Sequence, residues 1–258
     1  MKIGLCLETL GLPVRRGIAA AEKFGVAGVQ IDAVGDLAPR RLGDTGRREL
    51  RHLLRSHGLE LSALRAPLRH GLDVPDDLQP RIDRIKEVMS LSRELGAGIV
   101  VAEVGRIPDG ADDPRAPFLT EALTALGHHG DRIGAVLALE TGLEPGDDLA
   151  KYLATFDTGG LGVNYDPANL LMNGFEPLAQ LGPLVGKIVH AHAKDARSGG
   201  ASRSAREVPL GHGDIDWLAL CGTLAAAEYR GYLAVERDGG DDKAGDVAAG
   251  VAFLRRLM

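Results

Sequence analysis

Short apolar runs and amphipathic stretches alternate along this chain of 258 residues, and the pair repeats after about 30 residues. The apolar runs predict buried strands that begin near Lys2, Ala27, Leu59, Ala97, Gly134, Gly160, Gly186 and Gly231. The amphipathic stretches predict helices over 13–25, 44–58, 77–96, 114–130, 147–157, 175–183, 214–229 and 242–257. Strands separated by helices form parallel sheets, and eight such units favour closure into a single (β/α)8 barrel over residues 1–258 rather than an open sheet.

Several strands are preceded by a glycine that we expect to end the helix before it, since glycine readily adopts the left-handed conformation of a helix C-terminus. Gly25, Gly58, Gly96 and Gly231 occupy such positions. The Gly-, Ser- and Arg-rich segment Arg197–Arg206 is too short for a linker between domains. We predict that it forms a mobile loop over the mouth of the seventh strand.

The composition is that of an ordinary globular protein, with 45% hydrophobic and 26% charged residues. Acidic and basic residues are interspersed and sum to a net charge of −6, which argues against a surface for nucleic acid or anionic membranes. No apolar run approaches the roughly 20 residues of a membrane span, and the N-terminus enters a strand without a cleavable signal pattern. The two cysteines, Cys6 and Cys221, have no metal-binding spacing, and we expect core thiols in a protein of the reducing cytoplasm.

Ionisable residues end four successive predicted strands, which is where a β/α barrel places its functional groups. The fifth strand ends in Glu140, the sixth in Asp166 and the eighth in Glu236, while the seventh carries His190 and His192. A helix cap or a surface ion pair would explain any one of these carboxylates alone. Together they converge on one mouth, where their repulsion favours a bound cation, and three carboxylates with one imidazole suit Mn²⁺, Mg²⁺, Co²⁺ or Zn²⁺. We therefore predict one divalent metal ion at this mouth.

The late strands also carry a resemblance to a known family. Its most specific segments are Ala138–Glu140, Asn164–Pro167, His190–Asp195, Pro209–Trp217 and Gly231–Glu236. On these segments, and over nearly its whole length, the chain resembles the sugar phosphate isomerase/epimerase superfamily of xylose isomerase-like TIM barrels. That superfamily includes ketose 3-epimerases, hydroxypyruvate isomerase and inosose dehydratase.

The resemblance implies that the metal ion is held by Glu140, Asp166, His192 and Glu236. His192 is chosen over His190 because it lies nearer the end of its strand, whereas His190 shares its face one layer deeper. Asn169 stands where relatives with two or three metals often have a histidine. This departure favours a single metal site and assigns to the Asn169 amide a hydrogen bond with a substrate hydroxyl.

In the isomerases and epimerases that the chain resembles, one carboxylate removes a proton from a carbon next to a carbonyl group, and another returns a proton from the opposite face. Glu140 and Glu236 are the pair that the resemblance assigns to this enediolate chemistry. Substrate contacts are predicted for Asp195, Arg197, Glu103, Asn169 and His70, with Arg65 and Lys194 as further candidates. Each of these residues also has a plain structural explanation as a loop cap, a surface ion pair or a solvated charge.

The leading hypothesis is a divalent-metal-dependent isomerase or epimerase of a small sugar or keto-polyol. An inosose-type dehydratase would use the same site and share the first proton abstraction, and a non-catalytic barrel would keep the fold without the reaction. An abasic-site endonuclease is disfavoured, because Asn169 replaces a zinc-binding histidine and the net charge is −6. The expected partner is a small-molecule carbohydrate, with no nucleic acid and no membrane, while a homodimer stays open.

Overall fold

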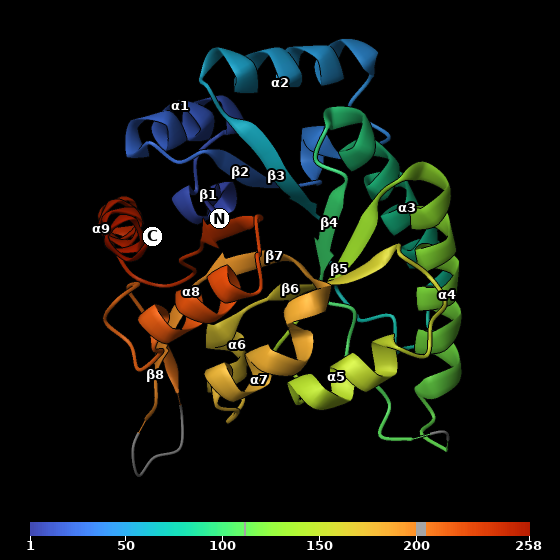
Figure 1. Ribbon diagram of the computed structural model, residues 1–258. Helices are drawn as coiled ribbons and strands as arrows, with labels where there is room; N and C mark the ends of the chain where they lie inside the picture. Colours follow the sequence, from blue (N-terminus) through green and yellow to red (C-terminus); the bar gives the residue numbers. More distant parts are fainter. Residues whose placement is uncertain (111, 200–204) are drawn as a thin grey trace.

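Eight parallel strands close into a barrel in the computed structural model, which describes residues 1–110, 112–199 and 205–258 (Figure 1). The strands are β1 (Lys2–Cys6), β2 (Gly28–Asp32), β3 (Glu60–Arg65), β4 (Ile99–Ala102), β5 (Val136–Glu140), β6 (Leu161–Tyr165), β7 (Ile188–Ala193) and β10 (Tyr232–Val235). The ring closes where β1 pairs with β2 on one side and with β10 on the other. Closure confirms the predicted (β/α)8 barrel and excludes the open sheet.

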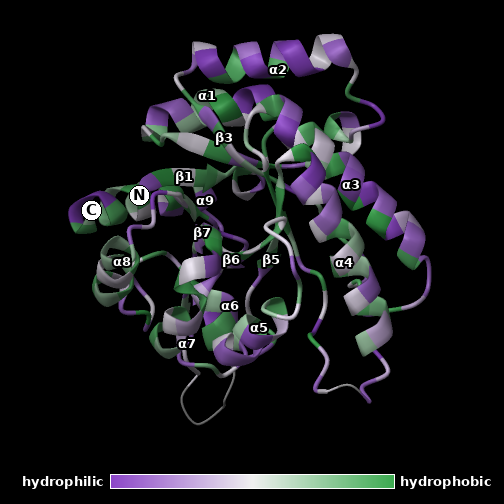
Figure 2. Cartoon of the chain, turned by 45° about the vertical axis from the view of Figure 1, so that its right-hand side comes forward, coloured by the Kyte–Doolittle hydropathy of each residue, from purple (hydrophilic) through white to green (hydrophobic). Residues whose placement is uncertain are grey.

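Eight helices follow the barrel strands as the sequence predicts, with bounds that differ by a few residues. They are α1 (Val14–Phe24), α2 (Asp44–Ser56), α3 (Leu78–Leu95), α4 (Ala116–Ile133), α5 (Gly146–Leu153), α7 (Pro177–Leu184), α8 (Trp217–Ala226) and α9 (Lys243–Leu257). The helices surround the strands, and their ribbons alternate between hydrophilic and hydrophobic residues, as expected of helices with one buried face (Figure 2). None of the described helices is long and apolar enough to cross a membrane.

Shorter elements, which the sequence patterns did not indicate, lie between these helices and strands. They are the short helix α6 (Pro167–Met172) and the 3-10 turns η1 (Leu7–Leu10), η2 (Gly35–Leu37) and η3 (Val185–Lys187). Helix α6 begins directly after β6, and the Asp166 side chain caps it by accepting a hydrogen bond from the backbone N–H of Asn169. One carboxylate of the predicted site is thereby fixed by the helix that follows its strand.

The interior of the barrel is polar below its mouth. Gln30 on β2, Ser62 on β3, Asn164 on β6 and His190 and His192 on β7 are all buried. Their side chains meet across the barrel, since His190 Nε2 lies 3.3 Å from Ser62 Oγ and His192 Nε2 lies 3.0 Å from Gln30 Oε1. A separate apolar cluster is formed by Ala63, Val101 and Ala138. The polar layer therefore forms the floor beneath the ionisable strand ends.

The first and last residues of the predicted loop Arg197–Arg206 belong to strands, so the prediction was wrong at both ends. Strand β8 (Asp195–Arg197) pairs in antiparallel fashion with β9 (Arg206–Val208), with Ala196 opposite Glu207, and residues 200–204 of the predicted loop lie outside the described residues. The hairpin extends away from β7 (Figure 1). Each of these strands has three residues, which is shorter than the run of about 4–8 residues that signals a strand in a sequence.

The expected glycine caps are found at three of the four positions. Gly25, Gly58 and Gly96 have φ angles of 69°, 66° and 100°. Gly231 is not such a cap: the left-handed residue after α8 is Glu228, with φ of 57°. A Cβ atom at position 231 would instead collide with the ring and hydroxyl of Tyr229, so close packing explains this glycine.

Helix α4 lies very close to the start of β6, and glycines allow this approach. A Cβ atom on Gly160 would overlap the carbonyl oxygen of Gly127 and lie 3.1 Å from the backbone nitrogen of Asp131. A Cβ atom on the neighbouring Gly159 would meet only the Asp131 side chain, at an ordinary 3.5 Å. Adjacent glycines thus differ sharply in the space around them.

We predict that Gly160→Ala lowers the free energy of unfolding by about 1–3 kcal/mol, because the helix or the strand must shift to admit the methyl group. Gly159→Ala, the matched control, is expected to change it by no more than about 0.5 kcal/mol. Urea unfolding followed by circular dichroism measures both. Equal effects of the two substitutions would contradict the close contact between α4 and β6.

Candidate active site

Four side chains from four neighbouring strands meet at one end of the barrel. Glu140 is the last residue of β5, Asp166 and Glu236 directly follow β6 and β10, and His192 lies near the end of β7. His192 Nδ1 lies 3.5 Å from Glu140 Oε1, 3.6 Å from Asp166 Oδ2 and 3.2 Å from Glu236 Oε2. No side chain in this group is more than 8% exposed. The fold thus brings together the four residues that the sequence analysis proposed as metal ligands.

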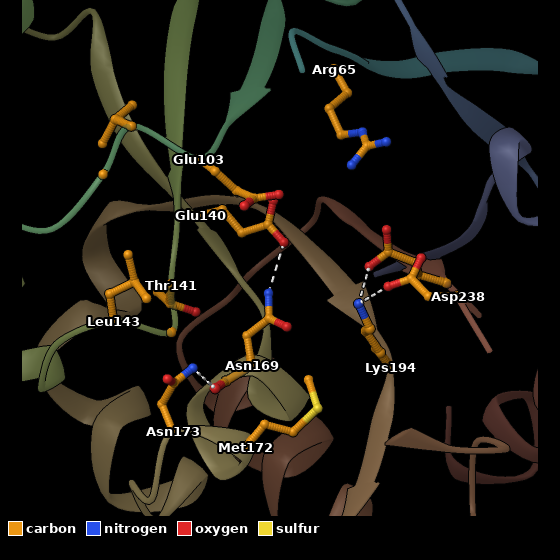
Figure 3. Close-up of a pocket in the computed structure, with 14 residues that line it drawn as sticks. Arg65, Glu103, Glu140, Thr141, Leu143, Asn169, Met172, Asn173, Lys194 and Asp238 are labelled. Atoms are coloured by element: carbon orange, nitrogen blue, oxygen red, sulfur yellow. Dashed lines mark hydrogen bonds and ion pairs between the residues drawn. The ribbon is translucent and has the colours of Figure 1, made fainter. Parts of the chain in front are cut away.

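Neighbouring residues hold these carboxylates in place. The Asn169 amide donates to Glu140 Oε1 at 3.0 Å (Figure 3). The Asn169 backbone N–H donates to Asp166 Oδ1 at 2.9 Å. On the opposite side, Lys194 Nζ donates to Glu236 Oε2 at 3.3 Å and also to Asp238. Each carboxylate therefore has at least one fixed oxygen.

Two of the remaining oxygens lack a partner. Glu140 Oε2 and Asp166 Oδ2 are buried and have no hydrogen-bond donor among the described residues. Leaving a buried carboxylate oxygen unpaired is unfavourable by several kcal/mol unless a donor or a cation is present. Three carboxylates and one imidazole, with ligand atoms within 4.8 Å of one another, fit a divalent cation.

The charges of the site shift the proton affinities of its members in different directions. Burial raises the pKa of Glu140. Burial acts the same way on Glu236, but His192, Lys194 and Arg65 outweigh it and lower the pKa of Glu236. For His192, the carboxylates of Glu236 and Glu140 overcome the effect of burial and raise its pKa. A divalent ion at Nδ1 would have to displace this proton, so ion binding is expected to weaken as the pH falls.

A cavity of about 320 Å³ opens beside the four residues, within the size range of small-molecule sites. Its charged and polar lining comes from Arg65, Glu103, Glu140, Thr141, Asn169, Asn173, Lys194, Glu236 and Asp238. Leu143 and Met172 add an apolar rim. Two of the predicted substrate-binding residues, Glu103 and Asn169, therefore face the space that a substrate would occupy (Figure 3).

The other three predicted substrate-binding residues do not line this cavity. Asp195 is buried and accepts hydrogen bonds from the backbone N–H groups of Ala196, Gly211 and Gly213, so it ties together the base of the β8–β9 hairpin. Arg197 donates to the carbonyl oxygen of His212, and His70 is exposed in the loop after β3. The hairpin turns the chain away after β7, which places Asp195 and Arg197 outside the lining of the cavity.

Lys194, Arg65 and Asp238 also line the cavity. The sequence indicated Lys194 and Arg65 only as further candidates for substrate contacts, and it did not indicate Asp238. Lys194 and Asp238 lie two residues beyond His192 and Glu236, so the two-residue period of a strand could have placed them on the same face. Arg65 ends β3 opposite Asp32 on β2, and its guanidinium binds that carboxylate through two hydrogen bonds of 2.7 and 2.8 Å. The signal for this pair lies in the register of two strands, which a single sequence does not contain.

Comparison with known proteins places this arrangement in a family. The family model of the xylose isomerase-like TIM barrel matches residues 18–257. The chain belongs to the xylose isomerase-like TIM barrel family. A solved structure of the same architecture, a xylose isomerase domain protein from Planctomyces limnophilus, has a TM-score of 0.85 and 24% sequence identity, covering 93% of this chain and 91% of that one.

Two curated proteins are similar to this chain in sequence. The rhizopine catabolism protein MocC of Rhizobium meliloti is 27% identical, over 88% of this chain and 75% of that protein. An inosose dehydratase of Lactiplantibacillus plantarum is 25% identical over 48% of each chain. The match to the dehydratase thus spans about half of that enzyme.

The two strand-seven histidines provide a matched test of the metal site. We predict that His192→Ala lowers the affinity for a divalent ion by at least about 100-fold, because it removes the imidazole nitrogen that lies within 3.6 Å of all three carboxylates. His190→Ala is expected to retain most of the ion, since His190 contacts Asn164 and Ser62 one layer deeper. Metal content after dialysis, with melting temperatures to verify folding, measures both. The reverse order would show that the other histidine is the ligand.

Proposed function

We propose that the protein is a divalent-metal-dependent isomerase or epimerase of a small, uncharged sugar or keto-polyol. The observation that supports the proposal is that two carboxylates line the wall of one cavity. Glu140 and Glu236 both line it, and they come from strands that are separated by β6 and β7. Glu140 lies on one side of the cavity, across from Lys194, the hydrogen-bond partner of Glu236 (Figure 3). Such a pair is suited to proton transfer on two faces of one substrate carbon.

The four residues Glu140, Asp166, His192 and Glu236 would hold the metal ion, which would supply a Lewis acid for the oxygens of a hydroxyketone. One glutamate takes the proton from the carbon next to the carbonyl group, and the other delivers a proton to the opposite face of the resulting enediolate. The Asn169 amide fixes the Glu140 carboxylate by its hydrogen bond to Oε1, which leaves Oε2 without a protein donor among the described residues. Lys194 places a positive charge beside Glu236 on the far side.

The charge of the cavity supports an uncharged substrate. Four carboxylates line it, and the two basic side chains in the described lining are already engaged. Asp32 holds Arg65 through two hydrogen bonds, and Glu236 and Asp238 both pair with Lys194. A phosphate group would have to break one of these pairs and would face the remaining carboxylates, so a phosphorylated sugar is disfavoured.

We predict that Glu236→Gln keeps the fold and lowers turnover by about 10²–10⁴-fold, because it removes one proton-transfer group. The measurement is incorporation of solvent deuterium into a panel of ketoses, made at saturating divalent ion because Glu236 also belongs to the metal set. Asp238→Asn is the matched control, since it alters a carboxylate that lines the cavity and contacts Lys194 but lies outside the set of four. Turnover of Glu236→Gln near that of the wild type would remove Glu236 from the catalytic pair.

Dehydration is the second candidate, and two observations favour it. The similarity to an inosose dehydratase is one. The other is Lys194, a proton donor that lines the cavity and could protonate a departing hydroxide. The first proton abstraction is common to both reactions, so deuterium exchange does not separate them. The product mass does: loss of one water identifies the dehydratase, and an unchanged mass identifies the isomerase or epimerase. A protein that binds the ion but exchanges no substrate proton would instead be a non-catalytic barrel.

A further inference from the structure

A second line of hydrogen bonds reaches His192 from inside the barrel. His192 Nδ1 faces the three carboxylates, while Nε2 points to the opposite wall and lies 3.0 Å from Gln30 Oε1. The other end of the Gln30 amide is also engaged, since its Nε2 donates to Cys6 Sγ at 3.3 Å. Cys6, Gln30 and His192 are at most 2% exposed, so water does not compete for these contacts.

We propose that Gln30 is a positioning residue that selects the tautomer of His192 and thereby makes the metal site competent; the inference rests on the metal site of the proposed function. An amide oxygen only accepts hydrogen bonds, so its partner, His192 Nε2, must carry a hydrogen. In the neutral imidazole the lone pair then lies on Nδ1, which is the nitrogen that faces the carboxylates. An amide turned the other way would place its NH₂ group against Nε2 and move the hydrogen to Nδ1, where it would block a metal ion.

Cys6 accounts for the orientation of the amide. A thiol is both a weak donor and a weak acceptor, so the Gln30 NH₂ group can donate to it while the stronger acceptor, Oε1, stays with the imidazole. In the reverse orientation, the carbonyl oxygen would accept its hydrogen bond from the thiol, which is a weak donor. The contacts with Cys6 and His192 therefore fix the orientation of the Gln30 amide.

Asn164, the other amide beside the ring, does not make this selection. Its Nδ2 lies 3.2 Å from His192 Nδ1 and 3.4 Å from Nε2, so it touches both ring nitrogens almost equally. Its Oδ1 is occupied by His190 Nδ1 at 2.9 Å. Of the two amides beside the ring, Gln30 is thus the one that distinguishes the two tautomers.

Substitutions at Gln30 test the inference through metal affinity. Gln30→Met removes the acceptor at similar length and is expected to raise the Kd for Mn²⁺ by about 10–100-fold, as is typical for residues that orient a metal-binding histidine. Gln30→Glu keeps an acceptor at the same place and is expected to restore affinity to within about threefold of the wild type. Ser62→Ala, which alters the interior network only at His190, is the control and should leave the Kd unchanged. Isothermal titration of dialysed protein with Mn²⁺ measures all four proteins.

Equal weakening in Gln30→Met and Gln30→Glu would overturn the proposal, because it would reflect general damage to packing. Wild-type affinity in folded Gln30→Met would overturn it as well. If the wild type itself bound no divalent ion, the metal site of the proposed function would fail, which is a distinguishable outcome.

The tautomer can also be observed directly in the wild type, whether or not Gln30→Met folds. Histidine labelled with ¹⁵N, in protein loaded with diamagnetic Zn²⁺, reports which ring nitrogen carries hydrogen, and His192→Ala assigns the signal. A protonated Nε2 with an unprotonated, metal-bound Nδ1 is the expected result. Hydrogen on Nδ1 would overturn the inference.

Discussion

The mutual repulsion of three buried carboxylates dominates the mouth of this barrel. In a flat sheet, β5 and β10 would lie three strand spacings apart, or about 14 Å. Closure of the barrel curves the sheet so that Glu140 and Glu236 both reach the same nitrogen of His192, at 3.5 and 3.2 Å. The fold thus concentrates negative charge where water is largely excluded, and the basic side chains of Lys194 and Arg65 partly offset it.

The offsetting groups are unevenly distributed. Lys194 contacts Glu236, and Arg65 adds positive charge on the same side, although Asp32 binds its guanidinium. Glu140 is held instead by the neutral amide of Asn169. Beneath the carboxylates, the buried side chains of Ser62, His190 and Asn164 form a chain of hydrogen bonds that ends at His192. A buried polar layer that satisfies its own donors and acceptors is rigid, and it can hold the side chains above it in fixed positions.

The barrel and the four central residues could be predicted from the sequence, because both rest on short-range patterns. Eight repeats set the fold, and carboxylates that end parallel strands must meet at one edge. The interior partners could not be predicted. Gln30 reads as an isolated polar residue in an apolar run, and its contact with a residue 162 positions away depends on how the ring closes. The position of Asp195 and Arg197 outside the cavity lining could not be predicted either, because the hairpin begins three residues after His192 and changes the direction of the chain without a local signal.

The uneven environment of Glu140 and Glu236 bears on the order of proton transfer. Two carboxyl groups whose surroundings push their pKa values apart are suited to opposite roles, one as acid and one as base. Burial raises the pKa of Glu140, whereas nearby positive charges lower that of Glu236. A divalent ion shared by both residues would lower both values, while Lys194 would still contact the Glu236 side. In the proposed reaction, this asymmetry favours Glu236 as the base and Glu140 as the group that returns the proton.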